Sequence, residues 1–206
     1  MLRNPNGLSY AVVSLLGATA VVDVFAFLAA LALRADPVPE GSADLIVALV
    51  SVVQLLLLVA TVVVWIVWFH RTRQNAQVWA PDLHSRGPGW AIGAWFIPFA
   101  NLWIPRNIAA EIWRASRRLP YAPDAPGELG LLNGWWALFV LQGLVDRVAG
   151  RLYEKAETPD AYVTAASWLA ANDIANIAAA VLAILFVRRL TSMQHAKATG
   201  MIPAAQ

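Results

Sequence analysis

The sequence predicts an all-α integral membrane protein: a four-transmembrane-helix bundle with a proline-broken segment and an amphipathic helix on its cytoplasmic side. Hydrophobic residues make up 59% of the 206-residue chain and charged residues only 14%, far from the average soluble domain. The apolar residues are gathered into long runs, and most basic residues lie in the connections on one side of those runs. Together these observations favour a bilayer over water as the surrounding medium.

Four runs are long enough to cross a membrane. A spanning helix needs roughly 20 mostly apolar residues, and its backbone polar groups must be paired within the segment. The predicted spans are residues 8–33, 45–69, 131–150 and 163–187. We expect residues 1–190 to form a single membrane domain and residues 191–206 to form a flexible tail.

The first run has an alternative interpretation as a cleaved signal peptide. Arg3 gives a modest positive start, and Ala30–Ala32 is a passable cleavage site. The apolar core is nevertheless too long for a signal peptide, and Asp23 lies inside it. We therefore expect a retained first span.

Basic residues predict the orientation. One side of the four-span arrangement carries Arg34, Arg151 and Lys155, together with several carboxylates. The other side carries most of the basic residues: Arg3, Arg71, Arg73, Arg86, Arg106, Arg114, Arg117, Arg118, Arg188, Arg189 and Lys197. By the positive-inside rule, this distribution predicts a multi-pass protein of the cell membrane with both termini in the cytoplasm.

The stretch 88–106, PGWAIGAWFIPFANLWIPR, is apolar but contains Pro98 and Pro105. A crossing here would place the basic groups before and after it on opposite sides, and two prolines would break its helical hydrogen bonds. Its tryptophans suit a headgroup boundary. We expect a re-entrant or interfacial segment that enters and leaves on the cytoplasmic face; the alternative is a fifth span.

The stretch RNIAAEIWRASRR that follows has the pattern of a basic amphipathic helix. Ile108, Ile112 and Trp113 share one face, and the charged residues cover much of the rest: Arg106, Glu111, Arg114, Arg117 and Arg118. Two compatible interpretations stay open. The helix lies on the membrane, where its arginines meet anionic headgroups, or it packs on the inner mouth of the bundle.

Three runs resemble a bacterial multi-pass membrane family catalogued as a domain of unknown function. They are W-F-H-R-T-R-Q-N-A at 68–76, G-P-G-W-A-I-G-A-W-F-I-P-F-A-N-L-W-I-P at 87–105 and E-I-W-R-A-S at 111–116. The signature W-F-x-P-x-x-N-L-x-x-P is carried here by Trp95 to Pro105, and Trp90 and Trp113 also stand at the family's spacing. The resemblance covers most of the chain. It implies the fold and the importance of 70–118, but no chemistry.

Polar residues inside the predicted spans form a first candidate site. By helical rise, Asp23, Gln54, Gln142 and Asp173 fall roughly 15 Å deep, and Arg147 lies one turn nearer the outer face, where it could pair with either aspartate. Charges in hydrocarbon are costly, so these groups should face one another. One interpretation is a proton or cation relay. The other is hydrogen bonding that holds the helices together.

The proline-broken segment supplies a second candidate. The Asn101 side chain could satisfy carbonyls freed by Pro98 and Pro105, or the segment could build a headgroup or anion pocket with Arg71, Arg73 and Glu111. His70, His84 and His195 show no metal-ligand spacing, and no catalytic motif is present. We expect a non-enzymatic module that binds a partner, a lipid or an ion, with no cofactor and no nucleic acid. Its expected partners are the bilayer, anionic headgroups or another membrane protein. The alternatives are a small transporter or channel component and a membrane enzyme.

Overall fold

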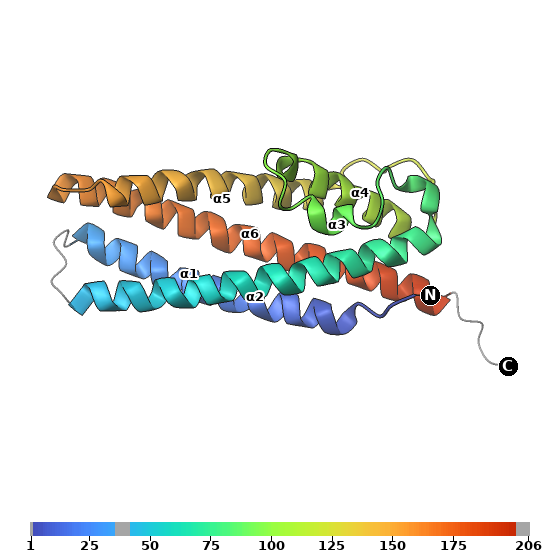
Figure 1. The fold of residues 1–206 in the computed structure, drawn as a ribbon, viewed down its shortest axis with the longest axis horizontal. Helices are drawn as coiled ribbons and strands as arrows, with labels where there is room; N and C mark the ends of the chain where they lie inside the picture. The colour runs from blue at the N-terminus through green and yellow to red at the C-terminus, as the bar shows by residue number, and fades with distance from the viewer. Residues whose placement is uncertain (1, 36–41, 201–206) are drawn as a thin grey trace. The chain divides into compact units, whose positions relative to one another are not determined.

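The computed structural model describes residues 2–35 and 42–200, and within these two ranges it contains helices but no strand. This confirms the all-α class. The long helices are α1 (Asn6–Ala35), α2 (Ser42–Trp79), α5 (Gly130–Glu154) and α6 (Pro159–Gly200) (Figure 1). The connection from α2 to α5 holds the shorter elements η1 (Pro81–Leu83), α3 (Trp90–Gly93), η2 (Ala100–Leu102) and α4 (Ile104–Ser116).

Three helical stretches are long and apolar enough to cross a membrane: Asn6–Ala35, Val52–Trp79 and Pro159–Gly200. They correspond to the first, second and fourth predicted spans. Helix α5 forms where the third span is predicted, but it is not among the three stretches. Its lower apolarity follows from Asp146, Arg147 and Arg151 in its second half.

The chain divides into two compact units. Unit 1 comprises Met1–Ser14, Thr61–Gly134 and Ile184–Gln206, and unit 2 comprises Leu15–Ala60 and Trp135–Ala183. Each long helix contributes one part to each unit. The single membrane domain expected over residues 1–190 stays a prediction.

Unit 1 has an aromatic core. Trp68, Phe69 and Phe186 are fully buried, and Trp113 is 6% exposed. The rings of Trp113 and Phe186 stack with centroids 6.0 Å apart, and Trp68 meets Phe186 edge-on at 6.3 Å. These contacts join α2, α4 and α6, because each helix places large aromatic side chains on the face toward the other two.

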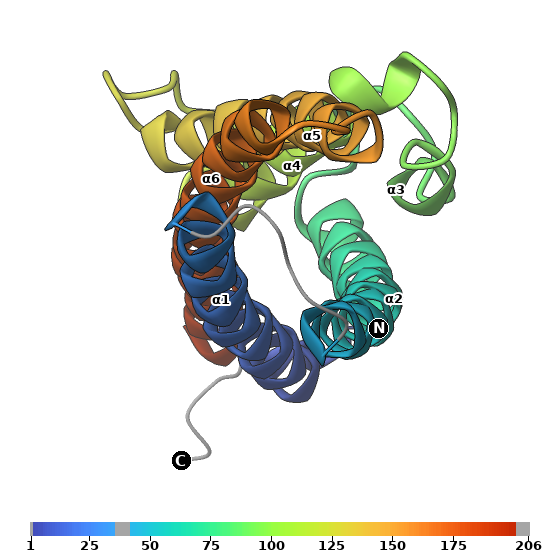
Figure 2. The same cartoon turned by 90° about the vertical axis from the view of Figure 1, so that its left-hand side faces the viewer.

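Unit 2 is held by contacts between neighbouring helices. The rings of Tyr153 and Tyr162 lie 6.0 Å apart, and Figure 2 shows this part of α5 beside the start of α6. Many large apolar side chains of this unit are exposed, including Phe25 (62%), Leu56 (65%) and Ile174 (56%). Such an apolar exterior is suited to contact with lipid.

The prediction of a flexible tail from residue 191 is wrong for residues 191–200, which continue α6. Thr191 and Gln194 are buried, at 6% and 1% exposure. Lys197 Nζ donates to the backbone oxygens of Ala115 (2.8 Å) and Arg117 (2.7 Å). The polar residues that suggested a tail therefore form contacts within the fold, including those of Lys197 with the end of α4. Residues 201–206 lie outside the described residues.

Candidate functional site

The proline-broken segment consists of short turns. Between residues 88 and 106 the structure has only the four-residue helix α3, the three-residue η2 and the first turn of α4. No helix in this stretch reaches crossing length, so a fifth helical span is not supported. Pro105 lies in the first turn of α4, where its missing N–H leaves no helical bond unmade. Phe99 takes a positive φ of 62° and turns the chain between α3 and α4.

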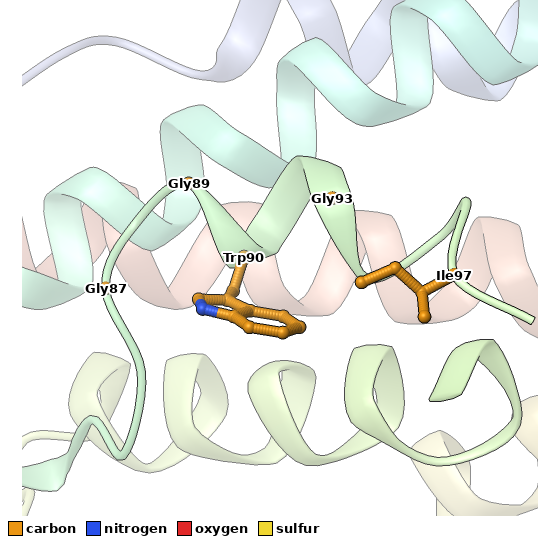
Figure 3. Close-up of a pocket in the computed structure, with 5 residues that line it drawn as sticks. All are labelled: Gly87, Gly89, Trp90, Gly93 and Ile97. Atoms are coloured by element: carbon orange, nitrogen blue, oxygen red, sulfur yellow. The ribbon is translucent and has the colours of Figure 1, made fainter. Parts of the chain in front are cut away.

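A shallow apolar hollow lies beside α3. It has a volume of ≈ 370 Å³ and is lined by Gly87, Gly89, Trp90, Gly93 and Ile97. Figure 3 shows the Trp90 indole and the Ile97 side chain projecting to the same side of the glycine-bearing backbone.

The same proline-broken segment exposes further large apolar side chains. Phe96 is 67% exposed, Phe99 76% and Trp103 51%. The Arg86 guanidinium lies 5.8 Å from the Trp90 ring centroid. The result is an apolar surface with a cation at its edge, which is the pattern of a membrane-interface segment.

Two of the three residues of the predicted anion pocket, Arg71 and Arg73, have partners within the protein, and Arg73 also interacts electrostatically with the third, Glu111. Arg71 Nη1 donates to Asn4 O at 3.0 Å, so it fastens the N-terminal segment. Arg73, 1% exposed, donates to Gln77 Oε1 and to Arg86 O, both at 2.7 Å. These donors are used within the protein.

The predicted hydrogen bonds from the Asn101 side chain to freed carbonyls are also not seen. That side chain has no hydrogen bond with any residue that the structure describes. The reason is that Pro105 begins a helix instead of interrupting one, so the carbonyl of Asn101 lies outside α4 and needs no N–H from residue 105.

Glu111 instead fixes the loop before α3. Its Oε1 accepts hydrogen bonds from Ser85 Oγ (2.6 Å) and Ser85 N (3.3 Å), and its Oε2 lies 3.6 Å from His84 Nδ1. The side chains of Glu111 and His84 are 12% and 1% exposed. Burial alone would raise the pKa of Glu111, but the interactions with His84 and Ser85 outweigh burial and hold that pKa below its usual 4.5.

Replacing Glu111 by Gln is expected to remove an acid-sensitive part of the stability. Because the folded-state pKa of Glu111 is depressed, its carboxylate stabilises the fold above about pH 4.5 and loses this effect as the pH falls. Thermal unfolding in detergent between pH 3.5 and 7 measures the difference. Wild type should lose more stability than Glu111→Gln on acidification, whereas parallel curves would contradict the role of Glu111. The exposed Asp82→Asn variant serves as control, with a curve like that of wild type.

Helix α4 turns its apolar face into unit 1. Ile108, Ile112 and Trp113 are 1%, 0% and 6% exposed. The Trp113 Nε1–H donates to Glu128 Oε1 at 3.1 Å. These side chains fit the interpretation in which the helix packs on the bundle. This face of α4 is therefore not available to lipid.

The arginines that follow Trp113 differ in their partners. Arg114 forms a bidentate pair with Asp124 (2.7 Å at its shortest), and its hydrogen bonds hold the pKa of Asp124 below its usual value. Arg117 pairs with Glu128 at 2.9 Å and with Asp124 at 3.3 Å. Arg118 is exposed and has no partner in the described part of the chain. Of these three arginines, only Arg118 is thus free to meet a headgroup.

A second cavity, the basic pocket, lies between the end of α4, the connection to α5 and the end of α6. It has a volume of ≈ 730 Å³. Its lining combines four cationic side chains with one carboxylate and apolar groups: Trp113, Ser116, Arg117, Arg118, Glu128, Arg189, Met193, Ala196, Lys197 and Gly200. Arg189, like Arg118, is exposed and without an ion-pair partner among the residues described. The pocket therefore offers two free guanidinium groups above an apolar wall.

A buried hydrogen-bond network, centred on Gln194, supports this pocket. Gln194 Nε2 donates to Thr72 O (2.9 Å) and Ser116 Oγ (3.1 Å), and Gln194 Oε1 accepts from Asn75 Nδ2 (3.1 Å). Asn75 also exchanges two bonds of 2.8 Å with the backbone of Arg3. One side chain thus connects α2, α4 and α6, and the N-terminal segment joins through Asn75.

The polar groups predicted at mid-membrane depth lie in unit 2. Asp23 and Asp173 are 3% and 7% exposed, and their carboxyl groups interact electrostatically. Gln54 Nε2 donates to Asp23 Oδ1 at 3.5 Å, a long hydrogen bond. The predicted pairing of Arg147 with an aspartate is wrong: Arg147 is exposed, and no described carboxylate forms an ion pair with it.

The cause is the position of the neighbouring residue on α5. Asp146 Oδ1 accepts a bond of 3.3 Å from Asn172 Nδ2, so Asp146 takes the position toward α6. The next residue along a helix points about 100° away. Gln142 is half-buried and has no hydrogen bond with the residues described. Of the five predicted intramembrane residues, the structure therefore brings Asp23, Gln54 and Asp173 together.

A family model described as a domain of unknown function, DUF4328, matches residues 33–192. The chain belongs to the DUF4328 family. The comparison with curated proteins gives no match, and neither does the comparison with solved structures. The DUF4328 match includes the proline-broken segment, α4 and most of the lining of the basic pocket.

Two contributors to the basic pocket could not be singled out from the sequence. Arg189 lies at the end of an apolar run, where it contributed only to the predicted orientation of the spans in the membrane. Glu128 lies in the connection after α4, where nothing in the pattern distinguishes it. Both reach the pocket because α6 extends past residue 190 and the connection folds back on Arg117.

Proposed function

We propose that this DUF4328 protein is a multi-pass membrane protein that binds the headgroup of an anionic lipid in its basic pocket. The observation that carries the proposal is the pair of unpaired arginines, Arg118 and Arg189, in the lining of that pocket. The role is one of binding, without catalysis.

The membrane topology we propose has four crossings, with α5 as the third. Three helices have the required length and apolarity, and α5 exposes Leu141 (51%) and Leu144 (56%), which suit contact with lipid. If α5 crosses, the basic residues near both termini and in the connection from α2 to α5 share one side. The positive-inside rule makes that side the cytoplasm.

The proline-broken segment then lies at the cytoplasmic boundary of the bilayer. The exposed side chains of Trp90, Phe96, Phe99 and Trp103 give it an apolar surface that no described residue covers. Burial of apolar surface is worth about 25 cal/mol per Å², and indole rings favour the headgroup region. Support for a re-entrant or interfacial placement comes from these exposed rings and from the turns at Pro98 and Phe99.

The chemistry of the basic pocket suits a phosphate-bearing amphiphile. Guanidinium groups bind phosphate through two parallel N–H donors, and they are more weakly hydrated than an ammonium group. Glu128 holds Arg117 in place, which leaves Arg118 and Arg189 to meet the ligand. Met193 and Ala196 supply an apolar wall for the part of the lipid next to its phosphate.

Replacing Arg118 and Arg189 together by Gln is expected to weaken binding of an anionic lipid about tenfold or more, at about 1 kcal/mol for each charge. The measurement is the amount of phosphatidylglycerol retained by native mass spectrometry after purification from mixed vesicles, as a function of salt. The matched control is Arg34→Gln with Arg151→Gln, which removes the same charge from unit 2. Equal retention by both double variants would contradict the proposal. Competition by millimolar inorganic phosphate would show that a free anion, and not the lipid, is the ligand.

A second candidate function is ion or proton transport through unit 2. It is favoured by one observation: the buried Asp23 carboxyl group contacts Gln54 and interacts with that of Asp173. Transport predicts that Asp23→Asn abolishes ion or proton flux in proteoliposomes while the melting temperature changes by less than about 3 °C, the effect of roughly 1 kcal/mol. A variant that only loses stability would show that Asp23 holds the helices together.

A further inference from the structure

Helix α5 carries an exposed pair of opposite charges at consecutive positions. Asp146 and Arg147 are both exposed, and they lie about two turns before the helix ends at Glu154. Asn172 holds Asp146 through its Oδ1 atom at 3.3 Å, and Asp146 Oδ2 stays without a partner in the described chain. Arg147 forms no ion pair with any residue described. An isolated charge pair is costly on the lipid-facing side of a crossing helix.

The surface around this pair permits close approach of another helix. Gly143, Arg147 and Gly150 follow one stripe of α5, at spacings of four and three residues. A Cβ atom added at either glycine would meet nothing within 4 Å. Leu144 (56%) and Val148 (42%), each one position after a residue of this stripe, are exposed about 100° around the helix from it, toward lipid. Small residues on one face of a helix are typical of helix pairs in membranes.

We propose that this face of α5 is the contact between two copies of the chain, related by a twofold axis along the membrane normal. Copies in one membrane have the same orientation, so equal residues lie at equal depth in both. A parallel α5–α5 crossing at residues 146–147 then places Asp146 of each copy beside Arg147 of the other, twice by symmetry. The inference rests on the proposed crossing of the membrane by α5.

The charges select a second copy over other occupants. A lipid phosphate would suit Arg147 alone, but Asp146 at the next position repels an anion. An unrelated helix would have to place a cation against Asp146 and an anion against Arg147. A second copy of the chain, turned by 180°, places its own Arg147 against Asp146 and its own Asp146 against Arg147. The alternative is a monomer in which this face of α5 contacts lipid and Arg147 extends to the headgroups. The test must distinguish this monomer from the dimer.

The absence of cysteine from the sequence makes the test direct. Gly143→Cys in native membranes should form an intermolecular disulfide on mild oxidation, in most of the protein. Val181→Cys serves as the matched control, since that side chain is 47% exposed on α6, away from the stripe. Equal cross-linking of the two variants would overturn the proposal.

Charge reversal tests the pairing itself. Arg147→Glu should reduce the dimer fraction in nanodiscs at least tenfold, and Arg147→Lys should retain it. Co-expression of Arg147→Glu with Asp146→Lys, on two different tags, should restore mixed dimers; a dimer indifferent to Arg147→Glu would contradict the pairing. Labelling of Glu157→Cys from outside the cell separates the two failures. If the label does not react there, the proposed crossing by α5 is wrong; if it reacts and the protein is monomeric, only this inference is wrong.

Discussion

Replacement of Trp68 by Ala is expected to lower the free energy of unfolding by about 3–5 kcal/mol, the usual cost of removing a buried aromatic side chain. Trp68 is fully buried and contacts Phe186 and Trp65, with ring centroids 6.3 and 5.2 Å away. Its indole N–H also donates to Thr191 Oγ1 at 3.1 Å. For a chain of this size the apparent melting temperature should fall by about 10 °C.

The loss can be divided between packing and hydrogen bonding. Trp68→Phe keeps an aromatic ring but leaves the Thr191 hydroxyl without its donor, whereas Thr191→Val removes the acceptor and keeps the shape. Fluorescence-detected size exclusion after heating measures all three variants, and Trp90→Ala at an exposed position is the control. A Trp68→Ala protein as stable as Trp90→Ala would show that the aromatic core of unit 1 is misassigned.

Replacement of Gln194 by Leu is expected to destabilise unit 1 by about 2–4 kcal/mol, because buried polar groups that lose their partner are costly. The change leaves Asn75 Nδ2, Thr72 O and Ser116 Oγ each without one hydrogen bond. Leucine has a similar volume, so the loss comes from hydrogen bonding more than from a cavity. Lipid retention should fall as well, since Ser116 lines the basic pocket.

The control for Gln194→Leu is Ser192→Ala, an exposed change two residues earlier on the same helix. The same heating assay should show wild-type stability for Ser192→Ala. The single variant Ser116→Ala should cost about 1 kcal/mol, because it removes one of the three contacts. If Gln194→Leu melts with wild type, the buried network does not hold α2, α4 and α6 together.

Hydropathy predicted the helical segments well, because bilayer crossing imposes a length and an apolarity that can be counted along the chain. The three most apolar runs, 8–33, 45–69 and 163–187, lie within α1, α2 and α6. Each of these helices contains a stretch of crossing length. The signature at 95–105 predicted the break in the chain. Its two prolines act differently, however: Pro98 precedes the turn at Phe99, and Pro105 begins α4.

The candidate site was less predictable, because it depends on which side chains meet. Charge alone does not distinguish Arg73, which is buried and bonded to Gln77, from Arg118, which is free. Equal depth along two helices does not give their rotation about their axes. The sequence therefore predicted that Arg147 could pair with Asp23 or Asp173, whereas Arg147 faces outward. The polar residues at 191–197 suggested a loose end, but their partners on α2 and α4 are more than 70 residues away in sequence.

The most direct test of the account is the location of the connection from α2 to α5 relative to the membrane. Single cysteines at Asp82, Ala125 and Glu157, all at exposed positions, can be labelled in intact cells with an impermeant maleimide. We expect Asp82→Cys and Ala125→Cys to react only after permeabilisation, and Glu157→Cys to react without it. Reaction of positions 82 and 125 from opposite sides would show that the tryptophan-rich segment crosses the bilayer, and would contradict the proposed topology.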